Sequence, residues 1–316
     1  MSIKSRKVAI IGTGLVGSSC AYALVNQGIC EEIIMIDINK DRAKSEALDL
    51  MHSVEYMSLR TKIRVGSYED CNDVDAVVIT AGPPPQPGQT RLDTLEVSVK
   101  ICNSIVEPVM KSGFNGFFIL ASNPVDVISY HVLKLSGLPK NKVIGTGTAL
   151  DTARLKSIIS EKLGGIDTKS IQAFAMGEHG DSQMVPWSCV TVAGESFLKL
   201  VSNYNKIEED NLDDIVKETA KAGWEIINGK GSTYYGIGAT VVGVLKAIFH
   251  DEKKVIPVSA LLEGEYEQND VYMGVPSILG KNGIEKIIEL DMKEKEKYEF
   301  NNSANILKEY IAKLGY

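Results

Sequence analysis

The sequence lacks any long apolar run, since no stretch approaches the roughly 18 residues that a membrane-spanning helix requires. We also expect no secretory signal, because the basic N-terminus leads into apolar residues that run into Gly12 without a small-residue cleavage site. There is no block of like charges, and 34 Lys and Arg stand against 41 Asp and Glu, a formal net charge of −7. We therefore expect neither a membrane anchor nor a nucleic-acid partner.

Cysteine and histidine are scarce. The five cysteines are odd in number, scattered and never in a Cys-x-x-Cys pair, which disfavours both a disulfide framework and a zinc site. We expect no metal, and a reducing cytoplasm fits this usage best. Of the four histidines, only His179 lies between glycines, Gly177 and Gly180, which give a ligand close access to the backbone. A lone histidine is usually structural, so the role of His179 stays open at this point.

The first half of the chain alternates short β-rich runs with longer helix-like stretches, which is typical of βαβ units around a parallel sheet. The expected strands are Lys7–Ile11, Glu32–Ile36, Lys62–Val65, Ala76–Thr80, Phe117–Ala121 and Val143–Gly145. Six such strands complete a doubly wound dinucleotide fold. We therefore predict an α/β, Rossmann-type dinucleotide-binding domain over residues 1–146.

Beyond Thr146 the pattern changes to a long helix beginning near Asp151, followed by further helices and strands. The strand-like segments are Ser170–Ala175, Val255–Leu261 and Val271–Val275. This mixture predicts a second, α+β substrate domain over residues 147–316. The last stretch, 284–316, is rich in Lys and Glu with apolar residues at helical spacing, and is read as a solvated helical face packed on the body.

A glycine motif, Gly12-Thr13-Gly14-Leu15-Val16-Gly17, separates the first expected strand from a helical pattern. Gly12 can make the tight turn, Gly14 lets the backbone approach a pyrophosphate, and Gly17 permits close helix–strand packing. The start of the helix offers amide donors to the anion. Asp37, at the end of the second strand, would accept hydrogen bonds from ribose hydroxyls and repel a 2′-phosphate. The predicted cofactor is NAD rather than NADP.

Asp151 and Arg154 lie three residues apart, which places both on one face of a helix. One helix could therefore present an acid that orients an imidazole and a guanidinium that clamps a carboxylate. An i,i+3 surface ion pair accounts for the same spacing equally well.

The chain resembles the L-lactate and malate dehydrogenase family over essentially its whole length, and the bacterial L-lactate branch most closely. The resemblance rests on seven ordered motifs: Gly12–Gly17, Asp37, Gly88–Arg91, Ser122–Asp126, Asp151–Arg154, Gly177–Asp181 and Ser232–Ile237. It implies reversible hydride transfer between NADH and pyruvate, giving L-lactate. It also implies a homotetramer, although no residue pattern in the sequence indicates an oligomer.

The same resemblance implies roles for individual residues. His179 is the proton donor and acceptor, Asp151 holds its ring, and Arg154 binds the substrate carboxylate. Arg91 is expected to polarise the carbonyl when a closing lid brings it in, and Asn123 to hydrogen-bond the reacting oxygen. Thr233 is expected to line the substrate pocket, and Ile237 to pack near the nicotinamide. Leu15, Val16, Ser122 and Asn123 complete the expected cofactor-binding set.

The expected lid departs from the family pattern. Its substrate-contacting position holds Pro85, followed by Gln86, where lactate enzymes typically have glutamine and malate enzymes arginine. The missing arginine argues against a dicarboxylate such as malate, whose second carboxylate would stay unpaired. Proline gives a stiff apolar wall that suits pyruvate but equally admits a larger aliphatic 2-oxo acid, which stays as the alternative substrate.

The positions that bind fructose 1,6-bisphosphate in many bacterial lactate enzymes hold Lys156 and Gln172 here, so we expect weak or absent activation. Two other functions are disfavoured. A catalytically silent NAD-binding sensor would not need the four residues His179, Asp151, Arg154 and Arg91 together. An NAD-dependent glycosidase would need a metal held by Cys and His, and no cysteine neighbours a histidine in a ligand pattern.

Overall fold

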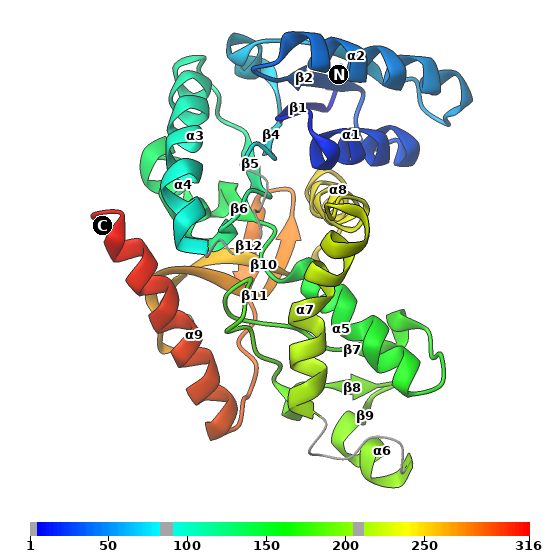
Figure 1. The fold of residues 1–316 in the computed structure, drawn as a ribbon, viewed down its shortest axis with the longest axis vertical. Helices are drawn as coiled ribbons and strands as arrows, with labels where there is room; N and C mark the ends of the chain where they lie inside the picture. Colours follow the sequence, from blue (N-terminus) through cyan, green and yellow to red (C-terminus); the bar gives the residue numbers. More distant parts are fainter. Residues whose placement is uncertain (1–4, 83–90, 205–211) are drawn as a thin grey trace. The chain divides into compact units, whose positions relative to one another are not determined.

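The computed structural model of the chain describes residues 5–82, 91–204 and 212–316. It divides into two compact units (Figure 1). Unit 1 consists of residues 1–146, 234–254 and 278–285, and unit 2 of residues 147–233, 255–277 and 286–316. The sequence predicts two continuous domains that meet at residue 146. Each compact unit instead consists of three separate segments, so that boundary stays a prediction.

Unit 1 is built on a parallel sheet. Its strands are β1 (Lys7–Ile11), β2 (Glu32–Ile36), β3 (Lys62–Val65), β4 (Ala76–Ile79), β5 (Phe117–Leu120) and β6 (Val143–Gly145). They are hydrogen-bonded in the order β6-β5-β4-β1-β2-β3, and every pair along that order is parallel. The strand order reverses between β1 and β4, and a ligand is expected at the carboxyl ends of these two strands. The predicted doubly wound α/β fold is confirmed.

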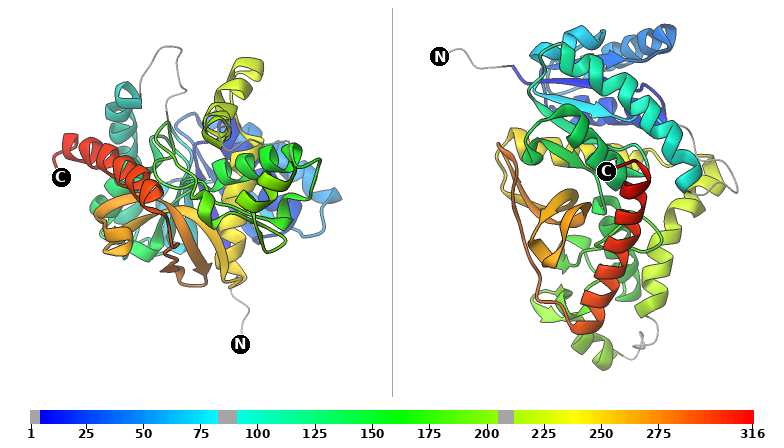
Figure 2. Two further views of the ribbon diagram at one scale, coloured as in Figure 1. Left: turned by 90° about the horizontal axis from the view of Figure 1, so that it is seen from below. Right: turned by 90° about the vertical axis from the view of Figure 1, so that its left-hand side faces the viewer.

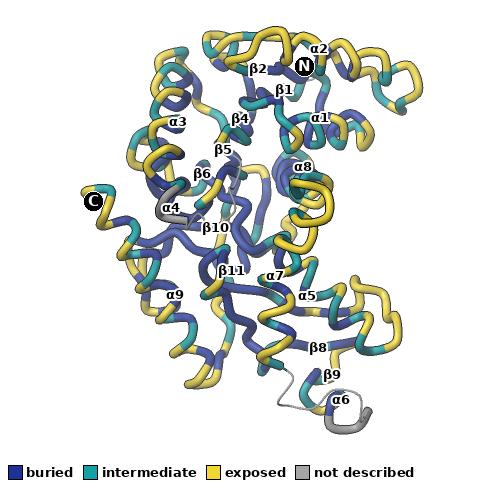
Figure 3. Tube along the Cα trace, viewed as in Figure 1, coloured by how far each residue is buried: buried dark blue, intermediate teal, exposed yellow. Residues whose placement is uncertain are grey.

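Helices cover both faces of this sheet, because a parallel sheet buries both faces and its strands read as apolar runs. The helices are α1 (Leu15–Gln27), α2 (Lys40–Ser53), α3 (Arg91–Lys111), α4 (Val125–Ser136) and α8 (Tyr235–Phe249). In Figure 1, α3 and α4 lie on one side of the strands and α1 on the other. All four residues of β4 are buried and dark blue in Figure 3, while much of α2 is yellow.

Unit 2 combines helices with one group of short strands and one group of longer strands. Its elements are α5 (Ala149–Lys162), β7 (Ile171–Gln172), β8 (Thr191–Val192), β9 (Glu195–Ser196), α6 (Phe197–Tyr204), α7 (Leu212–Lys230) and α9 (Glu294–Lys313). Strands β7, β8 and β9 form an antiparallel sheet. The longer strands β10 (Lys254–Glu263), β11 (Asn269–Gly280) and β12 (Gly283–Ile287) are bonded in the order β12-β11-β10 and carry residues of both units.

The core of unit 2 lies between α5, α6, α7 and the short strands. Trp187 and Phe197 stack there with ring centroids 5.4 Å apart, beside Leu155, Ile159 and Ile215, which are fully buried. Helix α9 (red) lies along the rest of unit 2 in Figure 2. Its Phe300 ring packs on the Tyr266 ring in the β10–β11 turn, with the ring centroids 4.9 Å apart. In the described part of the chain, no helix has the length and apolarity that crossing a membrane requires.

Two sequence expectations need correction. Residues 284–287 are not helical but belong to strand β12, because a segment of four residues is too short to reveal whether its apolar residues follow a helical period. The strand expected at Ser170–Ala175 is reduced to the two residues of β7, since the chain then turns toward a different partner: Met176 forms an isolated bridge with Met184.

Candidate active site

Asp151 links the two other residues of the proposed catalytic group. The Nδ1 atom of His179 lies 2.5 Å from Asp151 Oδ2, and Arg154 Nη1 donates to Asp151 Oδ1 at 2.9 Å. Because a carboxylate only accepts hydrogen bonds, the Nδ1 atom of His179 carries the proton. All three residues belong to unit 2.

The Asp151–Arg154 ion pair does exist at i,i+3, as the simpler interpretation of the spacing required. It is not a surface pair, however, because the Asp151 side chain is 2% exposed and that of Arg154 is 14% exposed. Burial raises the pKa of Asp151, but the neighbouring His179 and Arg154 outweigh it and hold that pKa below its ordinary value. Asp151 is therefore an anion at neutral pH, and it favours the protonated form of the imidazole.

The sequence places Asp151 in the first turn of α5. Gly147 precedes the helix at φ +50°, and a Cβ there would lie 2.3 Å from the backbone nitrogen of Ser259, so only glycine allows this close approach. A carboxylate in the first helical turn also interacts favourably with the helix dipole.

The guanidinium of Arg154 lies against α7. A Cβ built on Gly223 would be 3.3 Å from Arg154 Nη2, so the glycine leaves room for the side chain. Asp151 is the one partner of this guanidinium among the described residues. Its remaining N–H groups have the fork geometry that binds a carboxylate with two hydrogen bonds.

The residues just before His179 are tied to two neighbouring elements. The backbone N–H of Ala175 donates to Thr152 Oγ1 at 2.9 Å, which joins the segment to α5. Gly177 and Gly274 exchange two backbone hydrogen bonds of 2.9 and 2.8 Å, which join it to β11. These bonds hold a half-buried histidine, whose side chain is 25% exposed, in a fixed place.

In unit 1 the three motif glycines serve different purposes. Gly12 has φ +96°, and its Cβ would lie 2.7 Å from the backbone nitrogen of Ala81; a Cβ on Gly17 would lie 1.9 Å from the carbonyl oxygen of Gly12. Both glycines are therefore required by the protein's own packing. Gly14 differs, since nothing lies within 4 Å of its Cβ position and its φ of −70° is open to any residue.

Gly14 is the N-cap of α1, and no side chain caps this helix start. The free amides and the open space above Gly14 are what a diphosphate requires. Asp37 stands nearby, with Oδ2 accepting the backbone N–H of Thr13 at 2.7 Å and Oδ1 accepting that of Asn39 at 2.8 Å. These residues fit NAD: the helix start would hold its diphosphate and Asp37 its ribose.

The other predicted cofactor residues lie in the same unit. Leu15 is 52% exposed at the start of α1, where Val16 follows it. Ser122 is buried after β5 and donates to the carbonyl of Ala81 at 2.6 Å, while its neighbour Asn123 is exposed. Ser122 thus links the end of β5 to the segment after β4.

The first turn of α8 carries Ile237, and this helix packs on α1. The next residue, Gly238, approaches so closely that its Cβ would lie 3.1 Å from the backbone nitrogen of Cys20. Thr233 precedes α8, is half-buried and belongs to unit 2. The expected lid residues Pro85 and Gln86, and the side chain of Arg91, lie outside the described residues.

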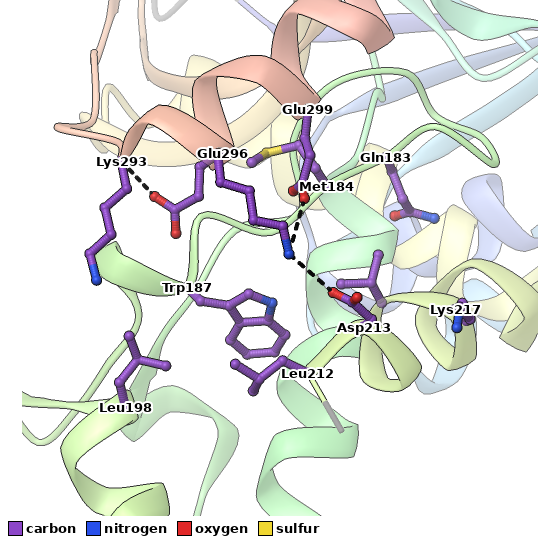
Figure 4. Close-up of a pocket in the computed structure, with 12 residues that line it drawn as sticks. Gln183, Met184, Trp187, Leu198, Leu212, Asp213, Lys217, Lys293, Glu296 and Glu299 are labelled. Atoms are coloured by element: carbon purple, nitrogen blue, oxygen red, sulfur yellow. Dashed lines mark hydrogen bonds and ion pairs between the residues drawn. The ribbon is translucent and has the colours of Figure 1, made fainter. Parts of the chain in front are cut away.

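A cavity of about 630 Å³ opens elsewhere in unit 2 (Figure 4). Trp187, Leu198 and Leu212 form apolar walls, and Lys295 spans from Asp213 to Glu299 across it. None of the proposed catalytic residues lines it. Within residues 5–82, 91–204 and 212–316, no group of three or more His, Cys, Asp or Glu is placed to hold a metal ion.

Two family models match successive parts of the chain. A model described as "lactate/malate dehydrogenase, NAD binding domain" matches residues 6–145, and one described as "lactate/malate dehydrogenase, alpha/beta C-terminal domain" matches residues 148–315. The chain belongs to the lactate/malate dehydrogenase family. The predictions of the family, of an NAD-dependent oxidoreductase acting on the CH–OH group of a 2-hydroxy acid, and of NAD as cofactor are confirmed.

Relatives in this family are similar over the full length. L-lactate dehydrogenase 3 of Bacillus thuringiensis subsp. konkukian is 56% identical over 100% of both chains. L-lactate dehydrogenase 2 of Lactococcus lactis subsp. lactis is 45% identical over 98% of this chain and 99% of that one. The crystal structure of the minor L-lactate dehydrogenase from Enterococcus mundtii in its ligands-bound form has a TM-score of 0.94 at 43% identity, covering 98% of each chain.

Sequence reasoning missed the residues that support this dehydrogenase site. Gly223 had a usable signal, because an isolated glycine inside a helical pattern often marks close packing. Thr152 sits inside a motif already singled out, but its bond to Ala175 joins two segments whose proximity no local pattern reveals.

Proposed function

We propose that this chain is an L-lactate dehydrogenase that transfers a hydride reversibly between NADH and pyruvate, giving L-lactate. The observation that carries the proposal is the contact of Asp151 with both His179, at 2.5 Å, and Arg154, at 2.9 Å. This arrangement supplies a proton donor and a carboxylate clamp side by side, which is what the reduction of a 2-oxo acid requires. The names of the relatives support the choice of substrate.

The bound NADH would supply the hydride, and the residues of the chain would control charge and orientation. As hydride reaches the carbonyl carbon, negative charge develops on the carbonyl oxygen. The protonated His179 neutralises that charge by giving its Nε2 proton to the oxygen, and in the reverse direction Nε2 takes the proton back. Asp151 stabilises the imidazolium and keeps its proton on Nδ1.

Arg154 would fix the substrate carboxylate with two parallel hydrogen bonds, and so decide which face of the carbonyl receives hydride. Asn123 and Arg91 keep the proposed roles of contacting and polarising the reacting oxygen, and Thr233 that of lining the substrate pocket. In unit 1, the Gly12–Gly17 segment with Asp37, Ser122 and Ile237 would bind the cofactor. The charges act strongly only where water is excluded, and excluding water is the proposed role of the lid.

Reduction of a larger aliphatic 2-oxo acid is the second candidate, because Pro85 stands at the lid position that faces the substrate side chain. The two candidates are separated by following NADH oxidation with pyruvate, a branched 2-oxo acid, phenylpyruvate and oxaloacetate. We expect pyruvate to give the highest kcat/KM. A branched acid or oxaloacetate ahead by more than about tenfold would contradict the lactate proposal, and no turnover with any of them would contradict the dehydrogenase itself.

Three further proposals concern the setting of the enzyme. We propose that it acts in the cytoplasm as a homo-oligomer, a tetramer by family resemblance, which sedimentation of the purified protein would test. Lys156 is half-buried and Gln172 exposed, and with one cation and no histidine we expect little activation by fructose 1,6-bisphosphate. A tenfold fall in the KM for pyruvate on adding it would overturn this.

A further inference from the structure

A closed ring of hydrogen bonds joins the His179 segment to helix α9. The backbone N–H of Glu178 donates to Ser303 Oγ at 2.8 Å. Ser182 Oγ lies 2.5 Å from Glu178 Oε2 and 3.0 Å from Ser303 Oγ. Ser303 is fully buried and Glu178 is 7% exposed, so the hydrogen bond between them is shielded from water.

The direction of each bond follows from the number of protons. Ser182 has a single hydroxyl proton, which it donates to the Glu178 carboxylate, so Ser303 must donate its own proton to Ser182 Oγ. Ser303 Oγ in turn accepts the backbone N–H of Glu178. Removing the Ser303 hydroxyl would leave that buried N–H without its acceptor and Ser182 without its donor.

Gly177 shows how closely α9 approaches this segment. The residue has φ +94°, and a Cβ on it would lie 2.6 Å from Ser303 Oγ. Two consecutive residues before His179 therefore meet the same serine, one by contact and one by a hydrogen bond. Since the imidazole must reach Asp151 Oδ2 at 2.5 Å, a shift of the Glu178 backbone moves His179 directly.

From this geometry we infer that Ser303 is a positioning residue for His179, holding the Gly177–His179 backbone so that the imidazole stays paired with Asp151. Ser303 does not touch the reacting atoms; it acts through the backbone of Glu178. The inference rests on the proposed function, in which His179 transfers the proton.

The test replaces Ser303 with Ala and follows a single turnover of NADH oxidation with saturating pyruvate. We expect the rate to fall about tenfold, because displacement of a catalytic group by a fraction of an ångström has effects of this order. The affinity for NADH and the KM for pyruvate should stay within about twofold, and the primary isotope effect with deuterated NADH should rise. A wild-type rate in the folded variant would overturn the inference.

Ser129→Ala is the matched control. Ser129 is also fully buried on a helix, but its hydroxyl donates to the carbonyl of Val125 within α4. Both variants lose a buried hydroxyl, so their Tm values should fall by similar amounts, whereas only Ser303→Ala should lose rate. An equal loss of rate in both variants would assign Ser303 a structural role alone.

A double-mutant cycle separates this inference from the proposed function. If Ser303 acts through His179, then adding Ser303→Ala to His179→Asn lowers the residual rate no further, and additive losses would overturn the inference. If His179→Asn alone keeps full turnover, the proposed role of His179 in proton transfer fails instead, and if the wild type turns over no 2-oxo acid, the proposed dehydrogenase function fails. Should Ser303→Ala fail to fold, Ser182→Ala takes its place, because Ser182 is only half-buried. The expected loss is then about threefold, and an unchanged rate would overturn the inference.

Discussion

The glycine segment of unit 1 and the histidine segment of unit 2 are built in different ways. The Gly12–Gly17 segment is shaped by contacts with neighbouring strand ends, such as the bond from Thr80 Oγ1 to the Gly12 carbonyl. The Ala175–Asp181 segment is held from three separate elements, through Thr152 of α5, Gly274 of β11 and Ser303 of α9. Both segments contain motifs that can be recognised in the sequence, but the support of the second by three elements is visible only once the chain has folded.

Apart from replacement of His179 itself, the largest effect is expected from Arg154→Lys, which tests the unit 2 side of this comparison. Lysine keeps the charge but loses the two-pronged hydrogen bonding, so kcat/KM for pyruvate should fall on the order of a hundredfold. Steady-state kinetics check this, with Arg64→Lys as control, because Arg64 pairs with Glu32 and Asp70 in unit 1. The role of Arg154 would be refuted by equal kinetics of wild type and Arg154→Lys.

A pair of glycine variants sharpens the unit 1 side. Gly17→Ala places a Cβ 1.9 Å from the Gly12 carbonyl, so we expect a loss of about 2 kcal/mol in the free energy of unfolding as well as weaker NADH binding. Gly14→Ala meets no protein atom, so its Tm without NADH should match wild type while the Kd for NADH rises about tenfold. Unaltered NADH affinity in Gly14→Ala would remove Gly14 from the cofactor site.

A smaller effect is expected from Gly223→Ala on α7. The added methyl group would sit 3.3 Å from Arg154 Nη2 and displace the guanidinium slightly, raising the KM for pyruvate about threefold. Gly229→Ala on the same helix is the control, since nothing lies within 4 Å of its Cβ. Both variants gain helix propensity and should be slightly more stable. Equal KM values in the two variants would show that the added methyl group at Gly223 does not affect Arg154.

The smallest effect concerns acid stability. The pKa of Asp151 is lowered in the folded protein, so its contribution to stability is complete above the ordinary carboxyl value of about 4 and is lost as pH falls through the lower folded value. Urea unfolding should therefore show wild type more stable than Asp151→Asn at neutral pH, with the gap closing below about pH 4. A gap that is constant with pH would contradict the ion pairing.

The fold was predictable because its signals are local. Strands such as β1 and β2 are short apolar runs beside a glycine motif, and the ends of β1 to β6 differ from expectation by at most one residue. The spacing of Asp151 and Arg154 also predicted that both side chains lie on one face of a helix, as they do on α5. What could not be predicted is the support of His179, because the bonds from Ser303 and Thr152 connect residues far apart in the chain.

The most direct test of the account measures turnover and NADH binding together in the His179→Asn variant. Because His179 lies in unit 2 and the proposed NADH-binding residues in unit 1, the variant should bind NADH with wild-type affinity, followed by fluorescence, while pyruvate reduction falls about a thousandfold. Retained turnover would contradict the role of His179, and loss of NADH binding would contradict the separation of the two functions between the units.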